Sequence, residues 1–186
     1  MRHIKSLSAV ITVCAIAGGA HAAGYEGPGL TADIYMGYED TLQPMMRVYV
    51  GSKGARMVPF NPADDGPDLY IARLSEGAQY EIFLERRRAY REPMEEHELA
   101  SARGDFCSSF ATKTKTGAET VSGRQTEVWK CQGAVDGPDQ VVWWDPLLKA
   151  EIRKSRAGLV VELLNIKVGQ PDPQLFDVPA GVRFIY

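Results

Sequence analysis

The sequence predicts a protein of the α+β class that is mainly β, and three observations support this prediction. Short runs rich in β-branched and aromatic residues recur along the chain, and glycine, proline, asparagine and aspartate separate them. Polar and apolar residues alternate within several runs, which is typical of antiparallel sheet with one solvated face. A helical pattern stands out in one segment, so helix is expected to be the minor component.

The predicted strands are identified by this alternation and by the turn residues at their ends. In one early strand Met46 and Val48 share a face, and in a later one Tyr80, Ile82 and Leu84 share a face. Glycine-containing turns between several strands favour hairpins and therefore antiparallel pairing. We expect strands at residues 30–36, 46–50, 55–60, 69–74, 79–85, 107–115, 119–121, 124–132, 140–144, 149–155 and 159–168.

One helix is predicted between two groups of strands, over residues 93–103. Pro93 suits the first helical position, because the N–H that proline lacks would have no partner there. Glu95 and Glu96 suit the first turn and Arg103 suits the last, since their charges complement the helix dipole. Gly104 can end the helix.

The C-terminal region is predicted to add a helix of a single turn. It is expected to begin at Asp172 and Pro173 and to place Leu175 and Phe176 on the core. The sequence shows no internal repeat, low-complexity segment or linker that would divide the chain. Residues 23–186 are therefore expected to form one domain of ordinary size.

Residues 1–22 are predicted to be a signal peptide for export. Basic residues precede an apolar stretch at residues 7–17, which is too short to span a bilayer. Ala20-His21-Ala22 has the small residues that signal peptidase requires, so we expect cleavage after Ala22 and a periplasmic product without a transmembrane segment. The alternatives are an uncleaved anchor and a lipoprotein anchored through Cys14.

The charge balance does not suit nucleic acid as a partner. Removal of Arg2 and Lys5 with the leader leaves 19 basic and 24 acidic residues, a net charge near −5. A mildly acidic surface of mixed sign attracts neither nucleic acid nor an anionic membrane. The one basic run, residues 86–88, is flanked by Glu85 and Glu92, so we interpret it as a solvated strand face.

Two cysteines remain after the leader, and in an oxidising compartment they are expected to form a disulfide. Cys107 and Cys131 are an even pair in a domain predicted to be exported. The alternative is a metal or redox site. The spacing matches neither CxxC nor a zinc pattern, and His97 is the one histidine left, so we predict no metal site.

The sequence contains no recognisable catalytic motif, and we predict a protein that is not an enzyme and has no cofactor. His97 lies among glutamates, which favours an exposed helix face over a catalytic base. Asp64, Asp65 and Asp68 share a Pro/Gly-rich loop but lack the alternating spacing of a calcium loop, so a solvated loop is favoured.

The tryptophans allow two interpretations, core packing or stacking against a ligand. Trp129 lies two residues before Cys131 and should share its face of the strand. Trp143 and Trp144 are adjacent, so they should point to opposite faces, one into the core and one toward solvent or a cavity.

The second half of the chain resembles the LolA-like superfamily of periplasmic lipoprotein and lipid carriers. The most specific part of the resemblance is the ending F-x-V-P-x-G. The matching segments are Gly123-Arg124 with Trp129-Lys130-Cys131, Val142 to Lys149, Glu162 to Lys167, and Pro171 to Gly181. The resemblance implies a curved antiparallel sheet that forms an incomplete barrel, with one or two short helices over its open side. It also implies an apolar concave face that accepts acyl chains.

The resemblance and the strand alternation together predict a ligand site on the concave face. Its candidate residues are Met46, Val48, Tyr80, Ile82, Leu84, Val161 and Leu163. We expect these side chains to lie beneath the helix over residues 93–103 and to line a cavity of a few hundred Å³. The predicted function is non-enzymatic binding of a lipid or other apolar ligand. The alternative is an envelope module with a filled core that binds a protein partner.

Overall fold

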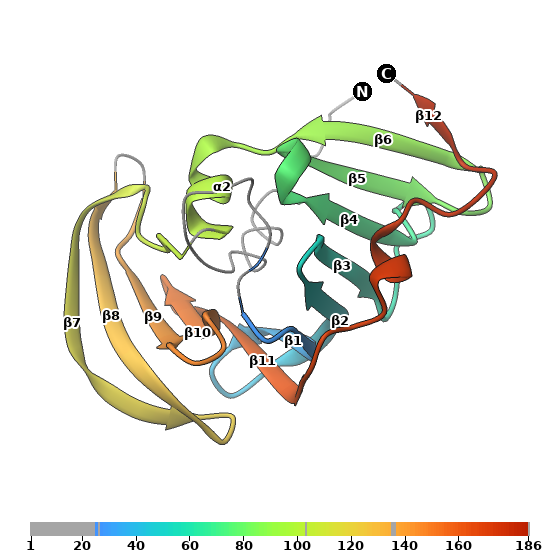
Figure 1. Ribbon diagram of the computed structural model, residues 1–186. Coiled ribbons are helices and arrows are strands. Elements are labelled where there is room, and N and C mark those ends of the chain that lie inside the picture. The colour runs from blue at the N-terminus through green and yellow to red at the C-terminus, as the bar shows by residue number, and fades with distance from the viewer. Residues whose placement is uncertain (1–24, 26, 103, 135–136, 186) are drawn as a thin grey trace.

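The computed structural model describes residues 25, 27–102, 104–134 and 137–185, and its strands form one twelve-stranded sheet (Figure 1). The predicted leader, residues 1–22 with its cleavage site, lies outside the described residues. The strands are β1 (Leu30–Tyr38), β2 (Gln43–Gly51), β3 (Gly54–Pro59), β4 (Leu69–Arg73), β5 (Ala78–Phe83), β6 (Arg88–Pro93), β7 (Phe110–Val121), β8 (Arg124–Ala134), β9 (Gln140–Asp145), β10 (Ala150–Arg156), β11 (Leu159–Val168) and β12 (Arg183–Ile185).

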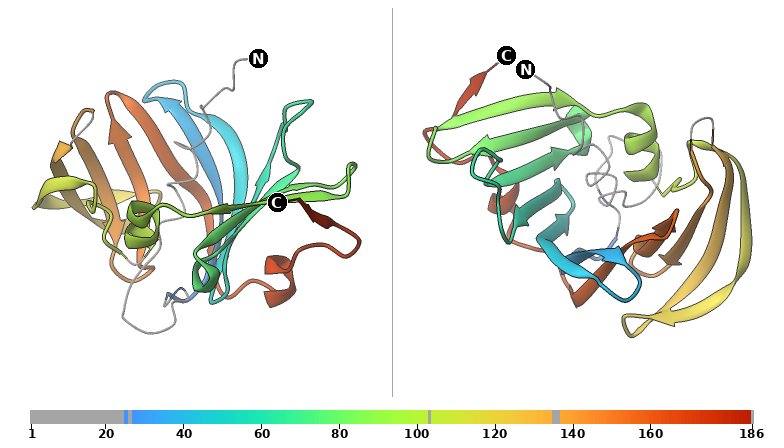
Figure 2. Two further views of the ribbon diagram at one scale, coloured as in Figure 1. Left: turned by 90° about the horizontal axis from the view of Figure 1, so that it is seen from above. Right: turned by 180° about the vertical axis from the view of Figure 1, so that it is seen from behind.

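The sheet is open and strongly curved, with the order β12-β6-β5-β4-β3-β2-β1-β11-β10-β9-β8-β7. Neighbouring strands are antiparallel, except that β12 runs parallel to β6. Strands β7 and β8 stand on one side and β4 to β6 on the other, with β1, β2 and β11 between them (Figures 1 and 2). This confirms the prediction of a mainly β, incompletely closed antiparallel sheet.

The single described α-helix follows from this strand order. Strands β6 and β7 are consecutive in the chain but lie near opposite ends of the sheet, so residues 94–109 must cross the open side. Helix α2 (Glu96–Ala102) lies in that crossing segment (Figure 1). Its first turn is capped by Glu98, whose carboxylate accepts a hydrogen bond from the Glu95 N–H at 2.7 Å.

The predicted helix over residues 93–103 is therefore too long at its start. Pro93 does not open the helix but ends β6, where it pairs with Ala78. The next residue, Met94, donates its N–H to the Gly77 carbonyl at 2.9 Å, which extends the strand contacts by one residue. Proline can occupy this place because β6 lies close to the sheet edge. The other predicted end, Arg103, is outside the described residues.

The predicted single-turn helix is confirmed as the 3₁₀ turn η3 (Pro173–Phe176). The Asp172 carboxylate accepts a hydrogen bond from the Gln174 N–H at 2.9 Å and caps the turn. Phe176 is 1% exposed, so it packs on the core as expected. A second 3₁₀ turn, η2 (Leu74–Glu76), links β4 to β5 and was not predicted.

The buried apolar residues form two clusters, one on each face of the sheet. The larger cluster lies on the concave face and draws on strands from both sides of the curve. The smaller one contains Leu69, Ile71, Ala78, Tyr80, Ile82 and Ala89, and Val178 and Val182 of the C-terminal segment pack against it. That segment therefore covers the outer face of β4 to β6.

Candidate functional site

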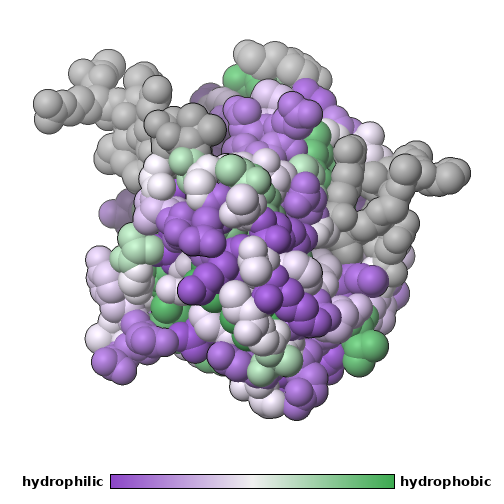
Figure 3. All heavy atoms as spheres, turned by 90° about the vertical axis from the view of Figure 1, so that its left-hand side faces the viewer, coloured by the Kyte–Doolittle hydropathy of each residue, from purple (hydrophilic) through white to green (hydrophobic). Residues whose placement is uncertain are grey.

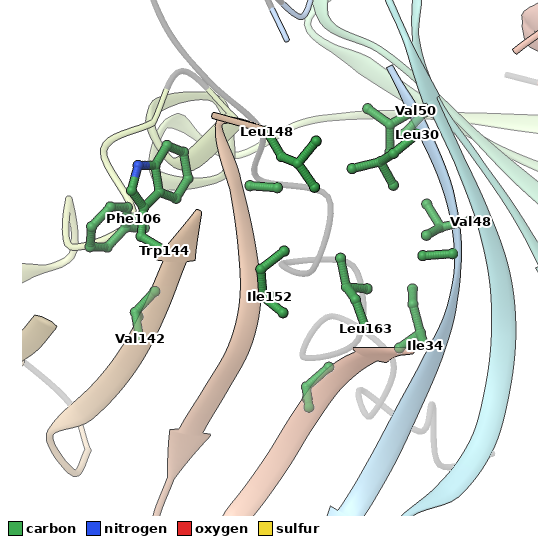
Figure 4. Packing of buried hydrophobic residues seen from close by; sticks show 14 of the residues in the cluster. Leu30, Ile34, Val48, Val50, Phe106, Val142, Trp144, Leu148, Ile152 and Leu163 are labelled. Atoms are coloured by element: carbon green, nitrogen blue, oxygen red, sulfur yellow. The ribbon is translucent and has the colours of Figure 1, made fainter. Parts of the chain in front are cut away.

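The concave face is an apolar surface to which both halves of the sheet contribute. Side chains from β1, β2, β9, β10 and β11 point into one interior, together with Phe106 and Leu148 from connecting segments (Figure 4). Its buried strand residues include Leu30, Ile34, Val48, Val50, Val142, Trp144, Ile152 and Leu163. We call this surface the inner face.

Strand register explains how these residues come to share one face. Ile34 of β1 pairs with Met46 of β2 on one side and with Leu163 of β11 on the other. Directly paired residues of adjacent strands point to the same face. The alternation within each strand therefore repeats across the sheet and concentrates apolar side chains inside the curve.

Four of the seven predicted site residues lie on the inner face. Met46, Val48, Val161 and Leu163 are buried members of the larger cluster. Met46 and Val48 lie on β2, and Val161 and Leu163 lie on β11. Strand β1 lies between these two strands, so the four residues share one face of three neighbouring strands. Their shared placement was predicted; contact of these residues with a ligand stays a proposal.

The prediction is wrong about the face on which Tyr80 and Ile82 lie. Val48 pairs with Met57 of β3, Met57 pairs with Tyr70 of β4, and Tyr70 pairs with Glu81 of β5. Paired residues point to the same face, so Glu81 points to the inner face. Its neighbours Tyr80 and Ile82 therefore point outward. Tyr80 and Ile82 are buried in the smaller cluster under the C-terminal segment. Leu84 lies in the turn after β5 and is 44% exposed.

The error has a physical cause. Period-two alternation shows which residues of a strand share a face, but not which face of the sheet this is when both are covered. Residues 69–72 of β4 are all buried, as expected for a strand with cover on both sides. That continuous apolar run was the available signal that the outer face here is buried too.

An aromatic group lies where α2 leads into β7. Phe106 packs against Trp144, with ring centroids 5.0 Å apart, and against Trp129 at 6.0 Å. The Lys113 Nζ lies 3.7 Å from the Phe106 ring centroid, a cation–π contact. Partial removal of the Lys113 ammonium from water beside the Phe106 ring lowers its pKa from the ordinary value, although Asp105 and other nearby acids oppose this effect.

The predicted disulfide is confirmed between Cys107 and Cys131, whose Cα atoms lie 5.4 Å apart. It ties the segment after α2 to β8, directly beside the aromatic group. Both cysteines are buried. The crossing segment is thus covalently fixed over one end of the inner face.

The two adjacent tryptophans divide as predicted. Trp144 is buried in the inner cluster, and Trp143 is half-buried on the other face. The Trp143 Nε1–H donates to the Glu119 carboxylate at 2.7 Å, and Arg153 lies 5.0 Å from its ring centroid. Packing and hydrogen bonding account for both side chains.

One small hollow on the inner face lies between β10 and β11. Glu151, Ile152, Lys154, Val161 and Leu163 line a space of about 10 Å³, which is enough for about one water molecule. The seven candidates cannot line one cavity, because Tyr80, Ile82 and Leu84 do not lie on the inner face. A cavity of a few hundred Å³ beside the other four stays a prediction.

The acidic and histidine side chains singled out in the sequence lie on the surface. Glu95, Glu96 and His97 are exposed, as predicted. Asp65 pairs with Arg86 at 2.6 Å, and the Asp68 carboxylate accepts the Leu84 N–H at 2.6 Å. Within residues 25–185, where described, no group of three or more His, Cys, Asp or Glu side chains could hold a metal ion.

The outer side formed by β7 and β8 is mostly hydrophilic, with scattered apolar side chains (Figure 3). Residues 111–120 of β7 are exposed. Residues 86–88 are also exposed, but Arg86 and Arg87 occupy the turn between β5 and β6 instead of a strand. No helix in the described part of the chain has the length and apolar character needed to cross a membrane.

Comparison with known proteins identifies relatives by structure alone. No protein-family model matches the sequence, and no curated protein is detectably similar to it. An uncharacterised conserved protein from Thermus thermophilus is 9% identical over 86% of this chain and 91% of its own, with a TM-score of 0.58. This likeness shows a shared fold.

Two further similar structures have TM-scores below 0.5. The MucA/MucB complex of Pseudomonas aeruginosa matches at 11% identity and a TM-score of 0.48, over 84% of this chain and 58% of that one. A LolA superfamily protein from Nitrosomonas europaea matches at 9% identity and a TM-score of 0.41, over 91% and 97% of the two chains. The second of these structures is from the superfamily that the sequence resembles.

Proposed function

We propose that the protein is a periplasmic, non-enzymatic binding protein that holds an acyl chain or similar apolar ligand against its inner face. The observation that carries the proposal is the continuous apolar surface inside an open, curved sheet. Burial of acyl surface provides a driving force of about 0.8 kcal/mol per CH₂ group. The leader predicted at residues 1–22 supports the location.

The open sheet offers a route for the ligand. Strands β6 and β7 are not paired with each other, and the segment that carries α2 crosses between them. The two sides of the curve can therefore separate without the loss of any strand pairing. This movement would enlarge the small hollow beside Val161 and Leu163.

A matched pair of substitutions tests the site. Val48 on the inner face and Val160 on the outer face are each 2% exposed, and each would be replaced by threonine. Threonine keeps the shape of valine but adds a hydroxyl, and an unpaired buried hydroxyl costs roughly 1–3 kcal/mol. When the sides of the curve separate, water can reach the added hydroxyl, and an acyl chain that packs there removes this water without replacing its hydrogen bond. The Val48→Thr variant should therefore bind a fluorescent fatty acid about tenfold more weakly than the wild type.

The Val160→Thr variant is the control for stability. Both variants should lose similar stability in chemical denaturation, while the control keeps wild-type affinity for the fatty acid. Equal affinities of the two variants would contradict binding on the inner face. Charged substitutions at Ile82 or Leu84 cannot serve as this test, because neither side chain lies on the inner face.

A second candidate function is binding of an envelope protein, and strand β7 favours it. This strand ends the sheet, so its outer edge carries no neighbouring strand in the described residues. It is twelve residues long and exposed almost throughout. Such an edge can accept an extended segment of a partner. A polypeptide that co-purifies with the protein, together with failure to take up the fatty acid, would favour this function.

A further inference from the structure

A second hollow, of about 510 Å³, lies on the outer face of the sheet around β1. Its lining consists of Ala32 and of polar residues, which are Thr31, Asp33, Arg47, Tyr49, Asn165 and Lys167. Its volume is in the range of small-molecule sites. The polar lining separates it from the apolar inner face and from any acyl ligand bound there.

A bulge in β11 shapes this hollow. The register between β1 and β11 shifts between Thr31 and Asp33, and Asn165 has a φ of +53°, in the left-handed region. Asparagine accepts this conformation more readily than most residues. The turn of the backbone brings the Asn165 Nδ2 to 2.9 Å from Asp33 Oδ2. Bulges of this kind often re-aim side chains next to functional sites.

Asp33 orients Arg47 from the neighbouring strand. The Arg47 Nε donates to Oδ1 at 2.8 Å and Nη2 donates to Oδ2 at 3.3 Å, so the guanidinium is held at two points. Asp33 is 6% exposed. The hydrogen bond from Arg47 lowers the pKa of Asp33, so its carboxylate is ionised at neutral pH, and it accepts three hydrogen bonds from Arg47 and Asn165.

The remaining groups in the hollow are mainly donors. Lys167 and Tyr49 both pair with Thr31, one from each neighbouring strand, so the three side chains form a row across the outer face. Arg47 and Asn165 lie about two residues further along their strands, roughly 7 Å away. Two cations and one carboxylate leave one positive charge, in a chain whose net charge is −3.

We propose that this hollow binds a phosphate group, either free or as the monoester of a small molecule or lipid headgroup. The Arg47 N–H groups that do not bond Asp33, the Lys167 ammonium and the hydroxyls of Thr31 and Tyr49 provide more donors than one carboxylate can accept, whereas a phosphate has enough oxygens to use them. The bonded Asp33 fixes the direction of the Arg47 fork before the ligand arrives.

The test uses the purified exported protein, with inorganic phosphate and glycerol 3-phosphate as separate probes and acetate as a comparison. Binding is followed by calorimetry and by the backbone amide shifts of Thr31, Tyr49 and Lys167. The Lys167→Gln variant removes one exposed cation. The Lys130→Gln variant removes an exposed lysine from β8, outside the hollow, and is the matched control.

We expect saturable binding of at least one phosphate probe, with shifts confined to the hollow and weaker binding of acetate. The probe that binds more tightly identifies a free phosphate or a headgroup as the source. Lys167→Gln should weaken binding about tenfold, the loss expected for one charge-assisted hydrogen bond, and Lys130→Gln should not change it. No saturable binding, equal loss in both variants, or acetate binding as tight as phosphate would overturn the proposal and leave Asp33, Arg47 and Asn165 as supports of the bulge.

Discussion

Loss of the disulfide should destabilise the protein by about 3.5 kcal/mol. Cys107 and Cys131 are 24 residues apart, so the bond closes a loop of about 25 residues in the unfolded chain. The chain-entropy relation for a loop of that length gives a stabilisation of roughly 3.5 kcal/mol at 25 °C. For a domain of this size the change corresponds to a fall of about 7–14 °C in Tm.

Chemical denaturation of three forms measures this contribution. The forms are the oxidised wild type, the reduced wild type, and a double variant with Cys107→Ala and Cys131→Ala. The two forms without the bond should both lose about 3.5 kcal/mol, and their denaturant m-values should rise because the unfolded chain is less restricted. A loss below about 1 kcal/mol, with an unchanged m-value, would refute the reasoning from loop closure.

Three further predictions concern single residues and the leader. The hydrogen bond from Arg47 lowers the pKa of Asp33, so the ionised carboxylate should stabilise the fold above the ordinary carboxyl pKa, and this stabilisation should be lost as the pH falls through the lowered pKa. The unfolding free energies of wild type and Asp33→Asn should therefore differ less at pH 3 than at pH 7. Phe176→Ala should cost about 3–5 kcal/mol in chemical denaturation, whereas Phe60→Ala, at a residue 40% exposed, should cost far less. Intact-mass measurement of the periplasmic protein should give an N-terminus at Ala23, and a retained leader or a lipid-modified cysteine would contradict the export prediction.

The sequence predicted most strands because their alternation is local. Ten of the twelve observed strands overlap the predicted ranges, and β7 was divided into two because Gly117, where the register shifts, interrupts its pattern. Strand β6 was missed because charged residues occupy its exposed positions and Ala89 is its one fully buried side chain. Strand β12 has three residues, too few to show a period.

The candidate site was predicted in part, because the sheet's two faces are set by contacts far apart in the sequence. Alternation grouped Met46 with Val48 correctly. It could not show that Tyr80 points outward, because the C-terminal segment that covers Tyr80 is distant in the sequence. The ring centroids of Tyr80 and Phe184 lie 5.7 Å apart. The outer hollow was also beyond sequence reasoning. It requires the register shift at Asn165, which appears only when β11 is paired with β1.

Native mass spectrometry of the protein purified from the cell envelope tests the central claim most directly. The account predicts one acyl-chain lipid bound per protein, released on denaturation, and lost or reduced in the Val48→Thr variant but kept in Val160→Thr. A protein that carries no lipid, and that takes up no fatty acid when one is offered, would contradict the proposal that the inner face is a ligand site.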